Sequence, residues 1–222
     1  MIRLPNNFQG KNITAKLEFT QTSDISSLYN DLSEIPKEIR REIENTKKFY
    51  ITFSEMESTV NEKVTIKYNE IIVKIPVVYK GNNYIFPIVS YVSNTYSLIR
   101  GFYLGFNKDN QFELVKSNEN ISFIKTGVMD ICIENAYEKN EWLKEEQNTE
   151  LSFPFLLFLN TNLIENRRKS NILSTQNYEK STSEILYIKE KRVGTVLNKA
   201  VYCSELYYTE DTFQVTGIKE VD

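Results

Sequence analysis

The sequence predicts a β-rich α+β protein, a barrel or a sandwich of strands with a few short helices. Isoleucine, valine, tyrosine and phenylalanine recur in short runs, and only 7 glycines and 5 prolines occur among 222 residues. Several runs alternate polar and apolar residues, as Val64-Thr-Ile-Lys-Tyr68 does, and this is the period of a half-buried strand. No internal repeat or low-complexity linker divides the chain, so we expect a single domain over residues 1–222.

Strand-forming segments follow one another along most of the chain, and turn sequences separate them. The segment Lys80-Gly-Asn-Asn83 connects two strong strands as a hairpin. Many strands with few helices favour a barrel or a sandwich. The predicted strands span residues 13–19, 50–53, 64–68, 71–79, 84–91, 112–116, 128–133, 153–159, 186–188 and 199–208.

Three segments have helical features. Ser23 is a suitable N-cap for a helix over residues 24–32, in which Ile25 and Leu28 have helical spacing. Pro36 suits the start of a second helix that continues through Glu44. Residues 138–147 form a third, mostly polar candidate. Residues 160–183 are mostly polar and are predicted to be a loop.

Composition excludes several classes of function. The chain contains no histidine, which rules out Ser-His-Asp and Cys-His nucleophiles, histidine-ligated metals and a histidine general base. Its 27 basic and 30 acidic residues nearly balance, so we expect no nucleic-acid partner. Any proton transfer must use carboxylates, lysine, tyrosine, cysteine or water.

The two cysteines and the apolar segments indicate a cytoplasmic protein. Cys132 and Cys203 are far apart in sequence and both lie in apolar segments, so we expect two reduced, buried thiols, with a disulfide as the alternative. The N-terminus lacks the apolar region of a signal peptide. The longest apolar run, residues 153–159, is too short to cross a bilayer. We therefore expect no membrane partner.

One lysine has surroundings that suit covalent chemistry. Lys108 follows an aromatic stretch and lies near Gly101 and Gly105, which allow the backbone to approach closely. Burial among aromatic side chains disfavours the charged form of a lysine, and the neutral amine can attack a ketone. The alternative is a solvated surface turn over residues 107–110.

The same stretch resembles the acetoacetate decarboxylase superfamily. Family members carry a strand with a P-V-x-Y/F-x-G motif, then an aromatic strand, then a G-F-P-K motif whose lysine forms a Schiff base. This chain has Ile75-Pro-Val-Val-Tyr-Lys-Gly81, residues 84–91, and then Gly105-Phe-Asn-Lys108. The resemblance implies a barrel or cone of strands, a carbon–carbon lyase acting on a β-keto acid or another small carbonyl compound, no cofactor and a homo-oligomer.

The registration also carries over individual residues. Lys108 corresponds to the Schiff-base lysine, and Glu70 and Glu55 correspond to the two family glutamates, which would act as acids or bases. Lys11, in Phe8-Gln-Gly-Lys11, stands where the family has a substrate-orienting arginine. The predicted walls of the pocket are the aromatic residues Phe102, Tyr103 and Phe106.

Departures from the family motif bear on the substrate. Asn107 replaces the proline and Asp109 replaces a second lysine, while Phe102 and Tyr103 replace an arginine and a glutamate. These changes predict that acetoacetate itself is a poor substrate. They also leave two alternatives open: a barrel that binds a small molecule without turnover, and an interaction protein that retains only the fold.

Overall fold

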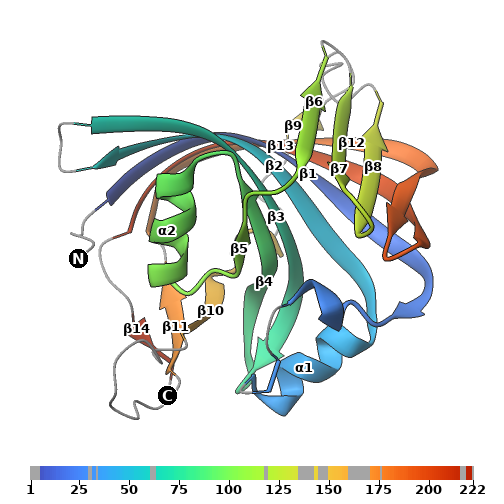
Figure 1. Cartoon of the computed structure of the whole chain (residues 1–222), viewed down its shortest axis with the longest axis horizontal. Coiled ribbons are helices and arrows are strands. Elements are labelled where there is room, and N and C mark those ends of the chain that lie inside the picture. The colour runs from blue at the N-terminus through green and yellow to red at the C-terminus, as the bar shows by residue number, and fades with distance from the viewer. Residues whose placement is uncertain are drawn as a thin grey trace.

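The computed structural model describes residues 6–29, 32–33, 35–60, 64–117, 120–134, 143–144, 150–159, 171–175, 177–215 and 219–221 (Figure 1). Within these ranges the strands form one large, strongly curved sheet, with two short α-helices beside it. The predicted β-rich fold class with a few short helices is confirmed.

The described part of the sheet contains 14 strands. The long strands are β1 (Asn6–Ser23), β2 (Thr46–Val60), β3 (Val64–Tyr79), β4 (Asn82–Val92), β12 (Asn177–Val196) and β13 (Lys199–Val215). The short strands are β5 (Lys108–Asp109), β6 (Glu113–Lys116), β7 (Ile121–Lys125), β8 (Met129–Ile133), β9 (Leu143–Lys144), β10 (Phe155–Leu159), β11 (Asn171–Thr175) and β14 (Lys219–Glu220).

The strands pair mainly with their neighbours in sequence. Their order is β14-β11-β10-β4-β3-β2-β1-β13-β12-β8-β7-β6, with β5 beside β4 and β9 beside β12. The pairs of β1 with β2, β2 with β3 and β3 with β4 are antiparallel. The short strands β5 and β10 instead run parallel to β4. The C-terminal strand β13 pairs with β1, which joins the two ends of the chain.

One face of the central strands packs into the main hydrophobic core. Ile13, Phe53 and Ile71 lie in register on β1, β2 and β3, and all three are buried in the largest apolar cluster. Burial of each such side chain contributes roughly 1.5–3 kcal/mol. Successive residues of a strand point to opposite faces, so the residues between these positions face the other side of the sheet.

The two helices lie on opposite faces of the sheet. Helix α1 (Lys37–Glu44) follows Pro36, as predicted, and buries Ile39 and Ile43 in the main core. Helix α2 (Thr95–Tyr103) begins at Asn94, whose side chain accepts hydrogen bonds from two backbone amides of the first turn. The sequence reading missed α2, which lies over the polar face of β1–β3.

Several local expectations need correction. The described residues of the predicted helix 24–32, which are 24–29 and 32, do not form an α-helix. A 3-10 turn, η1 (Ser26–Leu28), takes its place because the Asp24 side chain accepts from the Ser26 amide and closes a local turn. Strands β11 and β12 occupy part of the predicted loop 160–183, whose residues 160–170 lie outside the described residues. Within the predicted helix 138–147, only β9 is described, and it is a strand.

Two further findings concern exposure and membranes. Both cysteines are free, but only Cys203 is buried; Cys132 is exposed because it lies on the outward phase of β8. Among the described residues, no helix is long and apolar enough to cross a membrane.

Candidate active site

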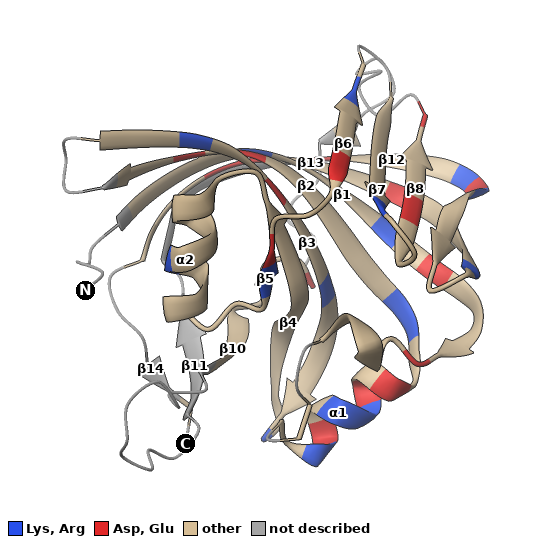
Figure 2. Ribbon diagram, viewed as in Figure 1, with Lys and Arg blue, Asp and Glu red and all other residues tan. Residues whose placement is uncertain are grey.

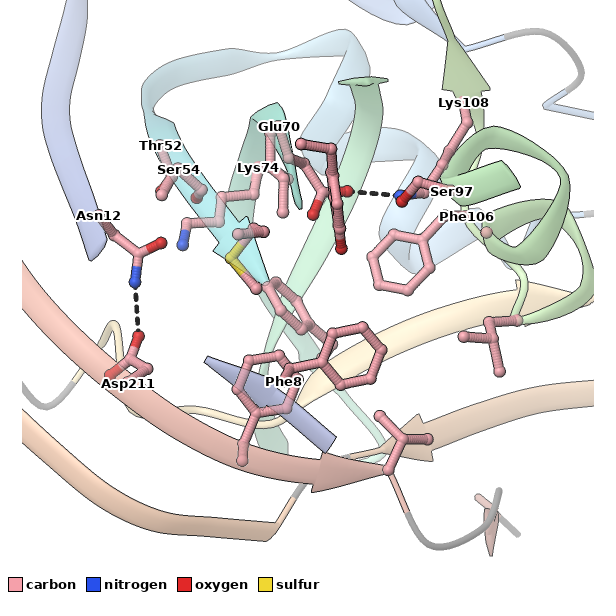
Figure 3. Close-up of a pocket in the computed structure, with 18 of the residues that line it drawn as sticks. Phe8, Asn12, Thr52, Ser54, Glu70, Lys74, Ser97, Phe106, Lys108 and Asp211 are labelled. Atoms are coloured by element: carbon pink, nitrogen blue, oxygen red, sulfur yellow. Dashed lines mark hydrogen bonds and ion pairs between the residues drawn. The ribbon is translucent and has the colours of Figure 1, made fainter. Parts of the chain in front are cut away.

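A cavity of about 210 Å³ lies on the polar face of the central strands (Figure 3). Strands β1, β2, β3 and β13 contribute side chains to its lining, and α2, β5 and β10 contribute others. The volume is below the roughly 300–1,000 Å³ of pockets that hold drug-sized ligands. The cavity therefore suits a small guest.

Strand register explains why this face is polar. Asn12, Ser54 and Glu70 lie opposite one another on β1, β2 and β3, and all three line the cavity. One pleat further along, Thr14 and Thr52 are paired, with their hydroxyl oxygens 2.8 Å apart. Each of these residues alternates with a core residue, so the same three strands supply both faces.

Lys108 and Glu70 form a buried ion pair at the centre of the cavity. The Lys108 Nζ lies 2.5 Å from Glu70 Oε1, and the two residues are only 8% and 7% exposed. The hydroxyl of Ser90 donates a second hydrogen bond to Glu70 Oε1 at 2.6 Å. Figure 3 shows the Lys108 and Glu70 side chains meeting from β5 and β3. An amine and a carboxylate in contact can exchange a proton directly.

Local structure brings Lys108 to this position. Gly105 has φ of +88° and follows the end of α2, and the Phe106 amide then bonds back to the Gly101 carbonyl. The side chain of Asn107 donates to the backbone carbonyls of Leu28 and Ile88 at 3.1 and 2.9 Å. These contacts hold the segment against β4, where Lys108 lies opposite Ser90.

Gly101 makes room for the lysine stem. A Cβ atom at residue 101 would lie 2.0 Å from Lys108 Cε and 2.2 Å from Cδ. Real contacts of this kind are never so short, so any larger residue at position 101 would displace the lysine. Gly101 is one of the two glycines that the sequence places near Lys108, and this close approach gives it a steric reason.

Aromatic rings and one arginine surround the rest of the cavity. The Phe106 ring packs edge-on against Phe155, and Lys108 Nζ lies 5.3 Å from the Phe106 centroid. Arg100, on α2, donates to Ser58 at 2.7 Å and lies 4.7 Å from the Phe8 ring centroid. Arg100 is only 3% exposed, and among the described residues that line the cavity it is the one arginine.

A second lysine lies in the cavity and was not predicted. Lys74 follows Glu70 by four residues on β3 and lines the same space. Burial lowers the pKa of Lys74 to about 8, although the carboxylates of Asp211 and Glu70 act in the opposite direction. Its position could have been read from the sequence, because residues 70, 72 and 74 of one strand share a face.

Strand β13 contributes to the cavity a polar contact between residues that are far apart in the sequence. Asn12 Nδ2 donates to Asp211 Oδ2 at 2.8 Å and to Thr209 Oγ1 at 3.1 Å. The two strands that carry these residues pair over most of their length. No local pattern in the sequence links positions some 200 residues apart.

Four of the predicted site residues lie outside the cavity. Glu55 faces the opposite side of β2 from Ser54, is exposed and pairs with Lys116 at 2.9 Å. Lys11 is exposed and lies opposite Glu55 in register, again on the far face from Asn12. In both cases the pleat points the predicted residue outward and its neighbour inward. The other two residues, on the exposed side of α2, are Phe102 and Tyr103.

Asp109 also points away from Lys108. Burial alone would raise the pKa of Asp109, but its hydrogen bond and ion pair with Lys125, at 2.7 Å, hold that pKa below its ordinary range. Figure 2 shows the basic and acidic residues of β5 next to each other along the strand. The replacement at position 109 therefore puts no carboxylate beside the Lys108 amine.

Metal-binding side chains do not cluster in the parts of the chain that the structure describes. No group of three or more histidine, cysteine, aspartate or glutamate residues comes together there. The described polar lining of the cavity consists instead of lysine, arginine, serine, threonine, asparagine and tyrosine side chains, with the carboxylates of Glu70 and Asp211.

Comparisons with known proteins identify similar folds. No family model and no curated protein sequence matches the chain. The enduracididine biosynthesis enzyme MppR superposes with a TM-score of 0.67 at 9% identity, over 100% of this chain and 89% of MppR. An acetoacetate decarboxylase-like enzyme from Sphingomonas wittichii RW1 gives 0.66 at 12% identity, over 100% and 94%. Acetoacetate decarboxylase from Legionella pneumophila gives 0.59 at 14% identity, over 99% and 88%.

Other structures of MppR contain bound molecules. One is a complex with pyruvate, and another contains the condensation product of pyruvate and imidazole 4-carboxaldehyde. At 9–14% identity the match over nearly the full length concerns the fold. It confirms what the Gly105–Lys108 segment suggested about architecture: this chain has the acetoacetate decarboxylase-like fold.

Proposed function

We propose that this protein is a Schiff-base-forming lyase that acts on a β-keto acid or another small carbonyl compound. Lys108 supplies the amine, and Glu70 is the acid or base beside it. The observation that carries the proposal is the buried ion pair of 2.5 Å between these two groups inside a cavity of about 210 Å³. No other carboxylate of the described cavity lining contacts Lys108.

The proposed chemistry balances without a cofactor. Glu70 accepts a proton from Lys108, and the neutral amine attacks the carbonyl carbon to form a carbinolamine. Glu70 then returns the proton to the carbinolamine hydroxyl, which leaves as water and gives a protonated imine. The imine accepts the electron pair of an adjacent C–C bond as carbon dioxide leaves, or of an adjacent C–H bond as Glu70 takes the proton, and either step gives an enamine. Protonation at carbon, from Glu70 or water, and hydrolysis by one water then release the product and restore the amine.

Three features support this proposal. The cavity is small and has apolar walls near Lys108, which limits the water that reaches the imine. The fold is shared with enzymes, among them one whose structures contain pyruvate and a pyruvate condensation product. Asn107 fills the position of the family proline without disturbing the segment, because its side chain binds two backbone carbonyls.

Reductive trapping tests the proposal. The protein is incubated with sodium borohydride and either pyruvate or acetoacetate, then digested and analysed by mass spectrometry. We expect a reduced adduct on the peptide that contains Lys108, and its loss in Lys108→Met. Lys67→Met is the matched control, because Lys67 lies on β3 with an exposed side chain. No adduct with these compounds or with longer and aryl-substituted keto acids would overturn the proposal.

A non-catalytic binding pocket is the second candidate. The Lys108–Glu70 contact favours it, since a buried ion pair of this kind also serves to neutralise two charges that the fold has enclosed. In that case carbonyl compounds should bind, and borohydride should leave the protein unmodified. Calorimetry together with the trapping experiment separates the two functions.

A further inference from the structure

Lys74 is a buried cation whose position the proposed reaction does not use. It is 8% exposed, and its Nζ has no hydrogen bond or ion pair with any residue that the structure describes. The nearest ring belongs to Phe155, whose centroid lies 5.6 Å from Nζ. Figure 3 shows the Lys74 side chain reaching into the cavity from β3. A buried ammonium without a partner is costly, so its retention calls for a counter-ion.

The acidic residues of the cavity are already engaged. Glu70 accepts from Lys108 and Ser90, and Asp211 accepts from Asn12. Among the residues that the structure describes, the charged ones that line the cavity are Lys74, Arg100, Lys108, Glu70 and Asp211. Their three positive and two negative charges give the described lining a formal charge of +1, which one monoanion would neutralise.

Uncharged donors lie on the same face as Lys74. Thr52 is one pleat away on β2, since it pairs with Ile72 while Lys74 pairs with Tyr50. Thr14, in contact with Thr52, and Ser54 complete a group of three buried hydroxyls that line the cavity. A carboxylate only accepts hydrogen bonds, so an ammonium with nearby hydroxyls is a suitable environment for it.

We propose that Lys74 anchors the carboxylate of the guest. The ligand class is a small monoanionic carboxylic acid, bound through Lys74 at one end of the cavity. If the proposed imine chemistry holds, the same molecule presents its carbonyl group to Lys108, and the substrate is a keto acid held at both ends. Lys74 is then a binding residue, and only the carbonyl end of the molecule rests on the proposed function.

The protonation of Lys74 fits this role. Burial lowers its pKa to about 8, which leaves roughly nine-tenths of the amine charged at pH 7. A bound carboxylate would favour the charged form and raise that pKa. Binding above pH 8 should therefore be accompanied by proton uptake.

Binding of propionate tests the anion site independently of imine formation, because propionate has no ketone. Isothermal titration compares propionate with propionamide, its uncharged analogue. We expect the unaltered protein to prefer propionate, and Lys74→Met to weaken propionate binding at least about tenfold with little effect on propionamide. Lys74→Arg should keep the preference, and Lys67→Met, on the same strand but exposed, should behave as the unaltered protein.

The unaltered protein provides a second measurement that needs no variant. Propionate affinity should fall about tenfold between pH 7 and pH 9, because the charged fraction of a lysine with a pKa of about 8 falls by that factor. The other titratable or charged groups that face the cavity or adjoin Lys74 in register are Glu70, Asp211, Lys108, Arg100, Tyr68 and Tyr50. Burial is the main cause that raises the pKa of Tyr68 and of Tyr50 beyond this window.

The outcomes separate this proposal from the proposed function. Equal affinity for propionate and propionamide, or an unchanged propionate affinity in Lys74→Met, overturns the anion site whether or not pyruvate is trapped on Lys108. If propionate binds selectively through Lys74 but borohydride traps no adduct, the anion site is supported. The proposed imine chemistry is then wrong. A propionate affinity that is constant from pH 7 to pH 9 also contradicts the proposal.

Discussion

Alternate residues of strands β1–β3 form two faces of the sheet, and these two faces have different roles. On one face Ile13, Ile51 and Phe53 are buried in the main core. On the other face Asn12 and Thr52 line the cavity. Adjacent residues of each strand lie on opposite faces of the sheet. The phase of this alternation, more than the type of residue, therefore decides which side chains can take part in chemistry.

Glu70 and Glu55 offer the strongest test of this difference. Glu70→Gln should slow turnover by about 10²–10⁴-fold, the usual contribution of a positioned acid or base. Glu55→Gln separates the two interpretations of that residue: its exposed position predicts unchanged turnover, whereas the family resemblance predicts a loss. Steady-state kinetics measure both, with Glu57→Gln, on the same strand, as the control. A large loss in Glu55→Gln would contradict the placement.

On the core face the expected effect is on stability. Ile51 is fully buried, so Ile51→Ala should lower the free energy of unfolding by about 2–5 kcal/mol. The exposed Val64→Ala on β3 should change it by less than about 0.5 kcal/mol. Urea denaturation followed by circular dichroism measures both values. Near-equal values for the two variants would show that this face is not the core.

Lys74 links the cavity face to stability through pH. Its pKa is lowered from 10.5 to about 8 on folding, so the unfolded chain binds more protons between these values and stability rises with pH in that window. The penalty, about 3 kcal/mol at pH 7, falls below about 1 kcal/mol at pH 10. The stability gained in Lys74→Met should shrink accordingly between pH 7 and pH 10. These measurements use a buffer without small carboxylates.

That prediction can fail in a specific way. If the stability difference between Lys74→Met and the unaltered protein is the same at pH 7 and pH 10, Lys74 does not titrate in this range. It would then be wrong to describe Lys74 as a buried ammonium without a partner. Lys67→Met, where the lysine is exposed, should show no such pH dependence.

The smallest expected effect concerns the threonine pair. Thr52→Val keeps the shape of the side chain and removes its hydroxyl, which lies 2.8 Å from that of Thr14. We expect a loss of about 1 kcal/mol in the free energy of unfolding, since the Thr14 hydroxyl still faces the cavity and can bind water there. Thermal denaturation measures it. A loss as large as that of Ile51→Ala would mean that the two faces are equally important for packing.

Much of the fold could be predicted because it depends on local patterns. The runs of β-branched and aromatic residues gave most of the long strands, and Pro36 marked the start of α1. Helix α2 was missed because its sequence, Thr95–Tyr103, is rich in aromatic and small residues with weak helical preference. Its stability comes from the Asn94 cap and from packing over the cavity, which only the folded chain provides.

Three of the predicted site residues lie together in the cavity, and one segment of the sequence carries them. Lys108, Glu70 and Phe106 all line the cavity, and each lies in the stretch that resembles known enzymes. Asn12 and Asp211 escaped notice because their contact depends on the pairing of the first and last long strands. Lys74 could have been found, since the phase set by Glu70 places residue 74 on the same face.

The space left by the missing side chain of Gly101 links the position of Lys108 to that of helix α2. The lysine stem passes where a Cβ would otherwise stand, 2.0 Å from Cε. Arg100 and Phe102 flank Gly101 in α2, so a shift of the helix register by one residue would place a side chain in this space. The position of the Lys108 amine therefore depends on the register of α2. The backbone of α2 at Gly101 thus determines how far the Lys108 Nζ extends into the cavity.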